Sequence, residues 1–413
     1  MAVFKPFKAF RPAQSVQDKI PALPYDVMNS DEAREAVKGN ELSFLHVDKA
    51  EIDLDKNIDI YDDAVYQKAK ENLEKLENEH FLCQDETPCF YIYRQKMGER
   101  TQTGLVGCAS IDDYINNNIK KHELTRADKE ADRIRHVDTC DANTGPIFLT
   151  YKNDERISAV INAFTCENEP VYDFNSNGVQ NTVWVISDSN LTDELFNFFS
   201  QVESLYIADG HHRCASAVKV GLKRREENPN FTGNEEFNFF LAVAFPDSEL
   251  EIMDYNRVVA DLNGNTTEEF LNKLNENFSL ELVGSEPFKP TESHTFGMYI
   301  DGKWYKLSAN ESIIDKNDPV LALDVSILQN YVLSPILGIG DPRTDKRIDF
   351  IGGIRGLKEL ERRANDDMKI AFSMYPTTVK ELMDIADADK IMPPKSTWFE
   401  PKLLSGLFIH HLS

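Results

Sequence analysis

The residues with the clearest capacity for chemistry lie in one stretch, 206–213, which reads Y-I-A-D-G-H-H-R. Its first three residues are typical of the end of a buried strand, and the next five have almost no capacity for core packing. Gly210 permits a sharp turn or a close approach to a ligand, and 214–219 predicts a helix. Amides at a helix start, together with Arg213 and two imidazoles, would bind an anion. We therefore expect a polar pocket at a strand end. A surface turn in which Asp209 caps the helix is the alternative.

Phosphoryl transfer is the reaction that these residue types fit best. It needs cations, amide donors, a metal ligand and one carboxylate that accepts the proton of the substrate. Arg213 and the neighbouring amides can hold phosphate, and Asp209 can ligate Mg²⁺. His211 or His212 can donate a hydrogen bond to a phosphoryl oxygen. Glu123 is the candidate base if the fold brings it close to this stretch.

Other local patterns are weaker signals. A hydrolase triad of Asp209, His211 and Ser216 is unfavourable, because the members of a triad usually come from separate elements. A cation and two hydroxyls, as in phosphate-binding loops, occur at Lys395, Ser396 and Thr397. They follow two prolines instead of a G-x-x-x-x-G sequence, so this segment is not a Walker loop.

Composition excludes several classes of function. The chain has 413 residues, with 45 basic and 70 acidic side chains and a net charge of -25, which would repel a nucleic-acid backbone. No apolar run approaches the roughly 20 residues of a membrane helix. The N-terminus lacks the pattern of a signal peptide, so we expect a cytoplasmic protein. Six cysteines without a C-x-x-C pair indicate reduced thiols.

The periodicity predicts an α+β or mixed α/β fold, in which strands and helices alternate around 206–213. Strands are expected at 44–47, 147–151, 183–186, 205–208 and 237–245, and helices at 61–79 and 192–202. Hairpins are expected at Met97-Gly98 and Asp301-Gly302, and a capping box at Thr266 with Glu269. Because no linker or repeat marks a division, the boundaries of domains are soft. The three expected regions are an N-terminal α/β region with a hairpin and a polar helix, a core with the D-G-H-H-R stretch, and a C-terminal α/β region with the P-P-K-S-T segment: 1–140, 141–260 and 261–413.

The most polar predicted helix covers 122–137. At 100° per residue, one side carries an apolar stripe of Leu124, Ala127, Ala131 and Ile134. The opposite side carries cations and imidazoles, and a solvated face is the simplest interpretation of it: His122, Arg126, Lys129, Arg133 and His136. Thr125 with Asp128 resembles a capping box, which would place His122 and Glu123 in the loop just before the helix.

Several motifs in one order resemble the bacterial domain-of-unknown-function family numbered 1015. The resemblance spans nearly the whole chain and is carried by Arg11-Pro12, Pro24-Tyr25-Asp26-Val27, His122-Glu123-x-Thr125 with Lys129 and Asp132-Arg133, Gly145-Pro146, Ala208-Asp209-Gly210-His211-His212-Arg213 and Met392-Pro393-Pro394-Lys395-Ser396-Thr397. It implies that a nucleotide or its phosphates are bound by Gly210, Arg213, His122, Thr125, Lys129, Arg133, Lys395, Ser396 and Thr397.

The D-G-H-H-R box is also similar to the phosphate-binding box of the ParB/sulfiredoxin-like superfamily, which includes chromosome-partition nucleotidases, sulfiredoxins and free-serine kinases. In the serine kinases such a box and an upstream glutamate lie at the site of phosphoryl transfer. Family 1015 genes also often neighbour serine-biosynthesis genes. The resemblance implies a nucleotide-binding core and a phosphotransferase acting on serine or phosphoserine, with Mg²⁺ and ATP, ADP or pyrophosphate. Its catalytic residues would be Glu123, Asp209, His211 and His212.

Two related activities in that superfamily fit less well. His211 stands where sulfiredoxin has its catalytic cysteine, and a charge of -25 disfavours a DNA clamp. A phosphatase acting on phosphoserine and a non-catalytic nucleotide-binding regulatory protein are the alternatives to the kinase-like function.

Overall fold

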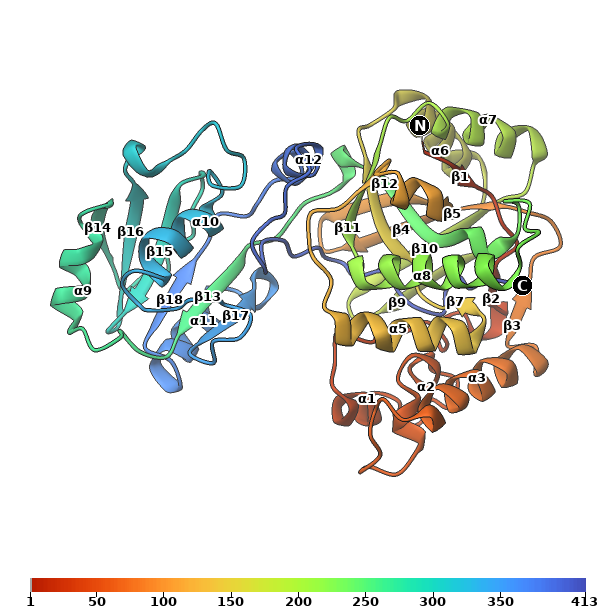
Figure 1. The fold of residues 1–413 in the computed structure, drawn as a ribbon, viewed down its shortest axis with the longest axis horizontal. Helices are drawn as coiled ribbons and strands as arrows, with labels where there is room; N and C mark the ends of the chain where they lie inside the picture. Colours follow the sequence, from red (N-terminus) through yellow and green to blue (C-terminus); the bar gives the residue numbers. More distant parts are fainter. Residues whose placement is uncertain (1) are drawn as a thin grey trace. The chain divides into compact units, whose positions relative to one another are not determined.

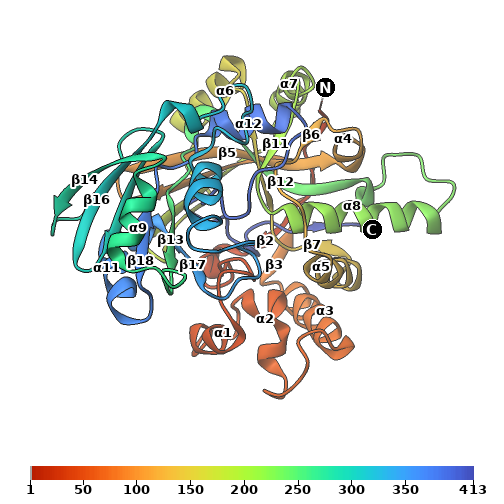
Figure 2. The ribbon, with the colours of Figure 1, turned by 60° about the vertical axis from the view of Figure 1, so that its left-hand side comes forward.

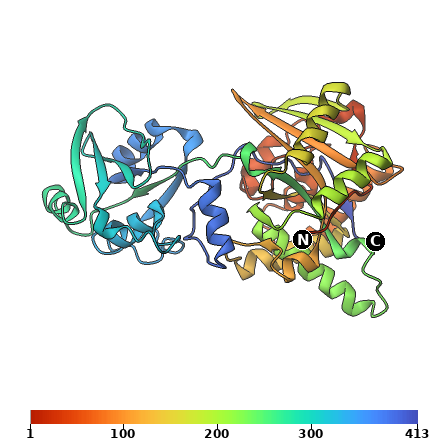
Figure 3. The same cartoon turned by 90° about the horizontal axis from the view of Figure 1, so that it is seen from above.

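The chain forms two compact units. In the computed structural model, which describes residues 2–413, the first unit contains the chain up to Leu250 and the segment Pro401–Ser413. The second unit is Glu251–Glu400. Both ends of the described chain, Ala2 and Ser413, therefore belong to the first unit, in which Figure 3 marks the termini. The three regions expected from the sequence stay a prediction about domains.

A mixed sheet forms the centre of the first unit. Its strand order is β6-β11-β8-β12-β5-β4-β10-β9, and β1 pairs with β5. The strands are β1 Phe4–Lys5, β4 Phe90–Met97, β5 Arg100–Ser110, β6 Ile119–Lys120, β8 Ile147–Tyr151, β9 Tyr172–Ser176, β10 Val179–Ile186, β11 Leu205–Asp209 and β12 Phe239–Pro246. Every residue of β12 after the first is buried, because the strand lies inside the sheet with neighbours on both edges. Two small pairs add β2 Phe10–Pro12 with β3 Leu82–Gln84 and β7 Ala142–Asn143 with β19 His410–His411.

The helices of the first unit form stacked rows beside this sheet. They are α1 Ser30–Ala36, α2 Leu45–Asp48, α3 Asp63–Asn78, α4 Ile111–Ile115, α5 Ala127–Cys140, α6 Glu155–Glu167, α7 Ser189–Phe199 and α8 His211–Glu227. Helix α8 contacts β12 on one side and α5 on the other, and α5 in turn contacts α3. Figures 1 and 2 show the same succession of α8, α5 and α3. Helix α5 is therefore covered on two flanks.

This position overturns one expectation about α5. Its charged side was expected to be solvated, but Arg133 and His136 are buried, while Leu124, before the helix, is 64% exposed. Ala127 and Ala131 are exposed as well. Neighbouring elements supply partners for the polar groups, which makes their burial tolerable. The part of the polar face that carries Arg133 and His136 consequently points into the unit, whereas Arg126 is exposed.

Two local predictions were also wrong. The segment 44–47 was expected to be a strand, but it enters α2, because a short apolar run does not distinguish a strand from a buried helical turn. Phe44, Leu45 and Val47 pack in the cluster that α3 covers. The expected capping box at Thr125 does not form, since α5 begins at Ala127 after an Arg126 N-cap without a side-chain cap. His122 and Glu123 nevertheless precede the helix, as that interpretation required.

The second unit contains another sheet, with the order β14-β16-β15-β18-β13-β17. Its elements are β13 Tyr255–Val259, α9 Thr267–Leu274, β14 Phe278–Gly284, β15 Thr295–Ile300, β16 Lys303–Ala309, α10 Asp324–Leu328, β17 Ile348–Gly352, α11 Leu357–Asp366, β18 Ile370–Ser373 and α12 Val379–Asp387. The predicted hairpin at Asp301-Gly302 is confirmed by the pairing of β15 with β16. The predicted capping box of Thr266 with Glu269 is also confirmed.

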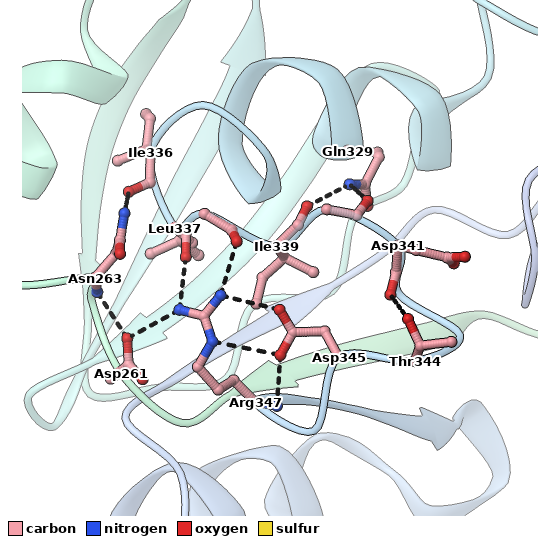
Figure 4. Close-up of polar contacts among 12 residues, drawn as sticks. Asp261, Asn263, Gln329, Ile336, Leu337, Ile339, Asp341, Thr344, Asp345 and Arg347 are labelled. Carbon is pink, nitrogen blue, oxygen red and sulfur yellow. Dashed lines mark hydrogen bonds and ion pairs between the residues drawn. The ribbon is translucent and has the colours of Figure 1, made fainter.

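The glycine-rich loop of the second unit is held by one arginine (Figure 4). Arg347 donates hydrogen bonds to the carbonyls of Leu337 (3.1 Å) and Gly338 (2.7 Å). Its guanidinium also pairs with Asp345 at 2.9 Å. Gly338 has a φ of +67°, which suits a turn.

The observed architecture confirms the mixed α/β class expected from the sequence. All six cysteines lie in the described part of the chain and carry free thiols. Among residues 2–413, the structure contains no helix with the length and apolarity needed to cross a membrane.

Candidate active site

Two strands of the first sheet bring the candidate residues to one edge. β6 and β11 pair in parallel, with Leu205 opposite Ile119 and Tyr206 opposite Lys120. Because parallel strands end at the same edge of a sheet, the residues after β6 emerge beside the residues after β11. The carboxylate Oε2 of Glu123 lies 3.8 Å from Nδ1 of His211. The sequence condition on Glu123, that the fold bring it near the D-G-H-H-R stretch, is met.

A third strand closes the same edge. β8 runs antiparallel to β11, with Phe148 opposite Asp209, so the chain just before β8 lies next to the tip of β11. The carbonyl of Pro146 accepts a hydrogen bond of 2.6 Å from Nη1 of Arg213. The Gly145-Pro146 motif and the D-G-H-H-R stretch are therefore parts of one site.

Gly210 makes the junction between β11 and α8 possible. Its φ is +91°, in the left-handed region, and α8 begins at the next residue. A Cβ at this position would lie 3.3 Å from the guanidinium of Arg213. The glycine thus allows both the abrupt turn and the placement of Arg213 over it.

Asp209 is held by cations. Nζ of Lys402 donates to its Oδ2 at 3.2 Å, and the amide of Gly210 donates to its Oδ1 at 2.9 Å. Burial raises the pKa of Asp209, but the charges of Lys402 and Arg213 and these hydrogen bonds outweigh it, so the net pKa is lowered. Asp209 is consequently an ionised carboxylate with both oxygens engaged.

These surroundings do not fit a direct Mg²⁺ site at Asp209. The ion favours oxygen ligands in near-octahedral geometry, whereas Asp209 already accepts two hydrogen bonds and faces two positive side chains. The role of Asp209 as a metal ligand stays a prediction.

His122 and His211 form a buried imidazole pair. The two side chains belong to residues that are 2% and 5% exposed, and their rings meet edge to face with centroids 4.5 Å apart. Burial lowers the pKa of His122 to about 4, although Asp209 and the backbone of Ile207 act in the opposite direction. Burial, and then the proximity of His122, lowers the pKa of His211 well below its usual range. Both rings are neutral at pH 7.

His212 has a different environment from its neighbour. Its Nε2 accepts a hydrogen bond of 2.9 Å from the backbone amide of Arg126. Burial lowers the pKa of His212, which favours the neutral acceptor form. His212 therefore fastens the loop that carries His122 and Glu123 to the start of α8. This contact suggests a positioning role, and the catalytic role expected for His212 stays a prediction.

Two arginines line a cavity of about 30 Å³ behind the strand tip. Its walls come from residues far apart in the sequence: Tyr25, Asp48, Arg133, His136, Val137, Asn143, Thr144, Gly145, Ile147, Arg213 and Ser405. The guanidinium of Arg133 lies 4.0 Å above the ring of Tyr25, and its Nε donates to Asp132 at 3.0 Å. The space suits one or two water-sized polar groups. Arg133, expected to bind phosphate, thus shares this cavity with Arg213.

Thr125, Lys129, Lys395 and Ser396, also predicted to bind a ligand, have partners of their own. The hydroxyl of Thr125 donates to Glu130 at 2.6 Å, and Lys129 donates to the hydroxyl of Tyr61 at 3.2 Å. The P-P-K-S-T segment belongs to the second unit and makes contacts there: the Lys395 carbonyl accepts from Arg257 at 2.9 Å, and the Ser396 hydroxyl donates to the Pro393 carbonyl. The roles predicted for Lys395, Ser396 and Thr397 stay predictions.

Sequence reasoning missed residues that come from the chain's return to the first unit. Lys402 holds Asp209, and Ser405 lines the cavity. Neither belongs to a recognisable motif, and both lie almost 200 residues from the D-G-H-H-R stretch. The only sequence signal near them is the proline-rich segment that ends just before them. Tyr25, by contrast, was part of a family motif whose role could not be read from its composition.

His136, which lines this cavity, should make the stability of the fold depend on pH. Burial and the nearby charge of Arg133 lower the pKa of His136, whose Nε2 donates to the Val47 carbonyl at 3.1 Å. Below pH 6.5, His136 therefore binds a proton in the unfolded chain but not in the folded chain. The free energy of unfolding consequently falls as the pH drops. His136→Gln should flatten the fall in the urea midpoint between pH 6.5 and pH 5. The exposed His80→Asn should leave it unchanged, and equal slopes in both variants would contradict the assignment.

Comparisons with known proteins give a family for the chain and several solved structures that are similar to it. The family model described as "Protein of unknown function (DUF1015)" matches residues 4–326. No curated protein matches. Among solved structures, a free serine kinase in complex with AMP is similar at 13% identity and a TM-score of 0.34, covering 73% of this chain and 89% of that one. A conserved hypothetical protein from Pyrococcus furiosus has 13% identity and a TM-score of 0.34, covering 76% of this chain and 98% of that one. SbnI with a C-terminal truncation, from Staphylococcus aureus, has 10% identity and a TM-score of 0.37, covering 73% and 85%.

Proposed function

The chain belongs to the DUF1015 family of proteins of unknown function, and we propose that it is a nucleotide-dependent phosphotransferase acting on a small hydroxylated metabolite. Serine or phosphoserine is the best candidate for that metabolite, and ATP, ADP or pyrophosphate for the phosphoryl donor or acceptor. The observation that supports the proposal is the meeting of Glu123 with the Asp209–Arg213 stretch at one sheet edge. A base, a cation and helix-start amides are the parts that this reaction needs.

The side chains have separate tasks in this proposal. Arg213 and the first amides of α8 hold the phosphoryl group and offset its charge. Glu123 accepts the proton of the attacking hydroxyl group, and its partly exposed position leaves room for a substrate beside it. His211, kept neutral by burial, can donate only one N–H, which suits a hydrogen bond to a phosphoryl oxygen better than full proton transfer.

Asp209 is proposed to organise the site electrostatically. Its negative charge keeps Lys402 at the strand tip. The Asp209 carboxylate interacts there with the charges of both Lys402 and Arg213. A phosphate that approached would meet two cations whose mutual repulsion Asp209 reduces. Transfer from phosphoserine to ADP would use the same groups in reverse, with Glu123 returning its proton to the serine oxygen.

Radiolabelled phosphate exchange tests the proposal in both directions. The full chain is incubated with ATP, ADP or pyrophosphate and L-serine, and separately with phosphoserine and ADP. We expect turnover in at least one pair, and Asp209→Asn should reduce it strongly because Lys402 and Arg213 lose their shared partner. The exposed Asp193→Asn on α7 is the matched control. If no pair turns over faster than with Asp209→Asn, the proposal fails.

The same assay separates the alternative functions. Phosphate release from phosphoserine without any nucleotide would identify a hydrolase. Tight nucleotide binding without turnover would identify a regulatory protein. The proposal predicts that turnover requires both a nucleotide or pyrophosphate and the hydroxylated partner.

A further inference from the structure

We propose that His122, Glu123 and His211 bind one divalent transition-metal ion, and that Zn²⁺ suits them best. One ring nitrogen from each histidine and one carboxylate oxygen all lie within 4.8 Å of one another. A tetrahedral zinc site with bonds of about 2.0–2.1 Å needs donor atoms roughly 3.4 Å apart. Nδ1 of His211 and Oε2 of Glu123 already lie 3.8 Å apart, and the side chain of Glu123 is 47% exposed, so it has room to move toward an ion. The proposal goes beyond the phosphotransferase function and does not depend on it.

The nitrogens of this cluster are available to a metal. Within residues 2–413, both ring nitrogens of His122 and Nε2 of His211 are buried without a hydrogen-bond partner of good geometry. A buried polar group without a partner costs free energy, and structures rarely leave one in that state without a reason. Here three such atoms belong to two rings in contact. A bound cation would satisfy one nitrogen on each ring.

The fold holds the two imidazoles independently of the ion. His122 follows β6 by two residues and His211 is the first residue of α8, so parallel pairing of β6 with β11 fixes their separation. Metal-binding histidines usually give their second N–H to a carbonyl or carboxylate, which orients the ring. The backbone of Ile207 lies against His122, and the charge of Asp209 acts on both rings. These groups are suited to be outer-sphere partners.

The donor set selects the class of ion. Two imidazoles and one carboxylate favour Zn²⁺ and other transition metals, whereas Mg²⁺ favours oxygen ligands alone. Structural zinc sites usually have four protein ligands, and a set of three leaves a coordination position for a water molecule or a ligand oxygen. The site is therefore of the open type. It is also separate from the Mg²⁺ site that the sequence predicted at Asp209, whose two oxygens already have other partners.

Equilibrium dialysis of the full chain against Zn²⁺, with metal content measured by mass spectrometry, tests this site. Nucleotide and serine are left out, so an absence of phosphoryl transfer cannot affect the result. All variants carry Cys83→Ser and Cys166→Ser, because these two exposed thiols could bind zinc on their own. We expect one Zn²⁺ per chain, and Co²⁺ in its place should give visible absorption bands of a nitrogen- and oxygen-coordinated ion.

The variants distinguish this site from other histidines. His122→Asn and His211→Asn should weaken Zn²⁺ binding by more than the roughly 10–100-fold that loss of an outer-sphere contact costs. Glu123→Gln should also weaken it, and this surface change does not threaten folding. His136 is a buried histidine outside this cluster whose Nε2 donates to a carbonyl, so His136→Gln should bind Zn²⁺ with the affinity of the parent. No stoichiometric binding by the parent, or parent-like affinity in the His122 and Glu123 variants, would overturn the proposal.

Discussion

Glu123→Gln is expected to lower kcat for phosphoryl transfer by a factor on the order of 10²–10⁴, the usual contribution of a positioned general base. The amide is nearly isosteric with the carboxylate but cannot accept the proton of the hydroxyl group. Because Glu123 contacts the site from a partly exposed loop, the change should leave the fold and the affinity for nucleotide nearly unaltered. The effect should therefore appear in kcat and not in the dissociation constant of the nucleotide.

A matched variant and a metal control show whether the loss of activity comes from a missing base or from a missing metal ligand. Glu203→Gln alters an exposed glutamate just before the opposite end of β11 and should retain full activity. Rates should be compared in chelator-treated protein and in protein loaded with Zn²⁺, since Glu123 is also a proposed metal ligand. An equal loss in both preparations indicates the base. Activity within a few-fold of the parent in either preparation would remove Glu123 from that role.

The position of Glu123 illustrates how far the sequence predicts this site. The strand tip at Asp209 was readable because an apolar run changes abruptly into polar residues, and the boundaries of β8 agree with the predicted 147–151. The proximity of Glu123 was not readable, because it depends on the parallel pairing of β11 with the two-residue β6. Such a short strand has no periodicity of its own. A glutamate could be proposed as a base from its residue type alone, but its position beside His211 follows only from the pairing of β6 with β11.

The interior of the first unit was less predictable for a different reason. Helical periodicity assigns the apolar side of a helix to the core, yet α5 buries Arg133 and His136. Their burial depends on the adjacent Asp132 and on Tyr25 and Asp48, which the fold delivers from other segments. Polar groups can be buried when each finds a partner, and a pattern along one helix carries no information about partners elsewhere. Deviations from the apolar pattern are consequently good places to look for function.

Arg213→Lys is expected to weaken the binding of nucleotide or phosphate by about tenfold to a hundredfold, which corresponds to one lost charge-assisted hydrogen bond of about 1.5–3 kcal/mol. In the native side chain, Nη1 is used to donate to the Pro146 carbonyl at 2.6 Å. The rest of the guanidinium lies over Gly210, at the strand tip. A planar fork can serve the carbonyl and a phosphate at once, whereas a single ammonium must leave one of them.

This prediction separates geometry from charge. Lysine preserves the positive charge, so the dependence of binding on salt should persist while affinity falls. Arg224→Lys is the matched control, because it lies on the same helix but pairs with Asp138 and Asp141. Calorimetric titration with ADP and with inorganic phosphate gives both affinities. Unchanged affinity would place Arg213 outside the anion site, and its role would then be to fasten the Gly145-Pro146 segment to α8. A loss of affinity in Arg213→Lys but not in Arg224→Lys would instead indicate that the guanidinium of Arg213 binds the Pro146 carbonyl and the phosphate at the same time.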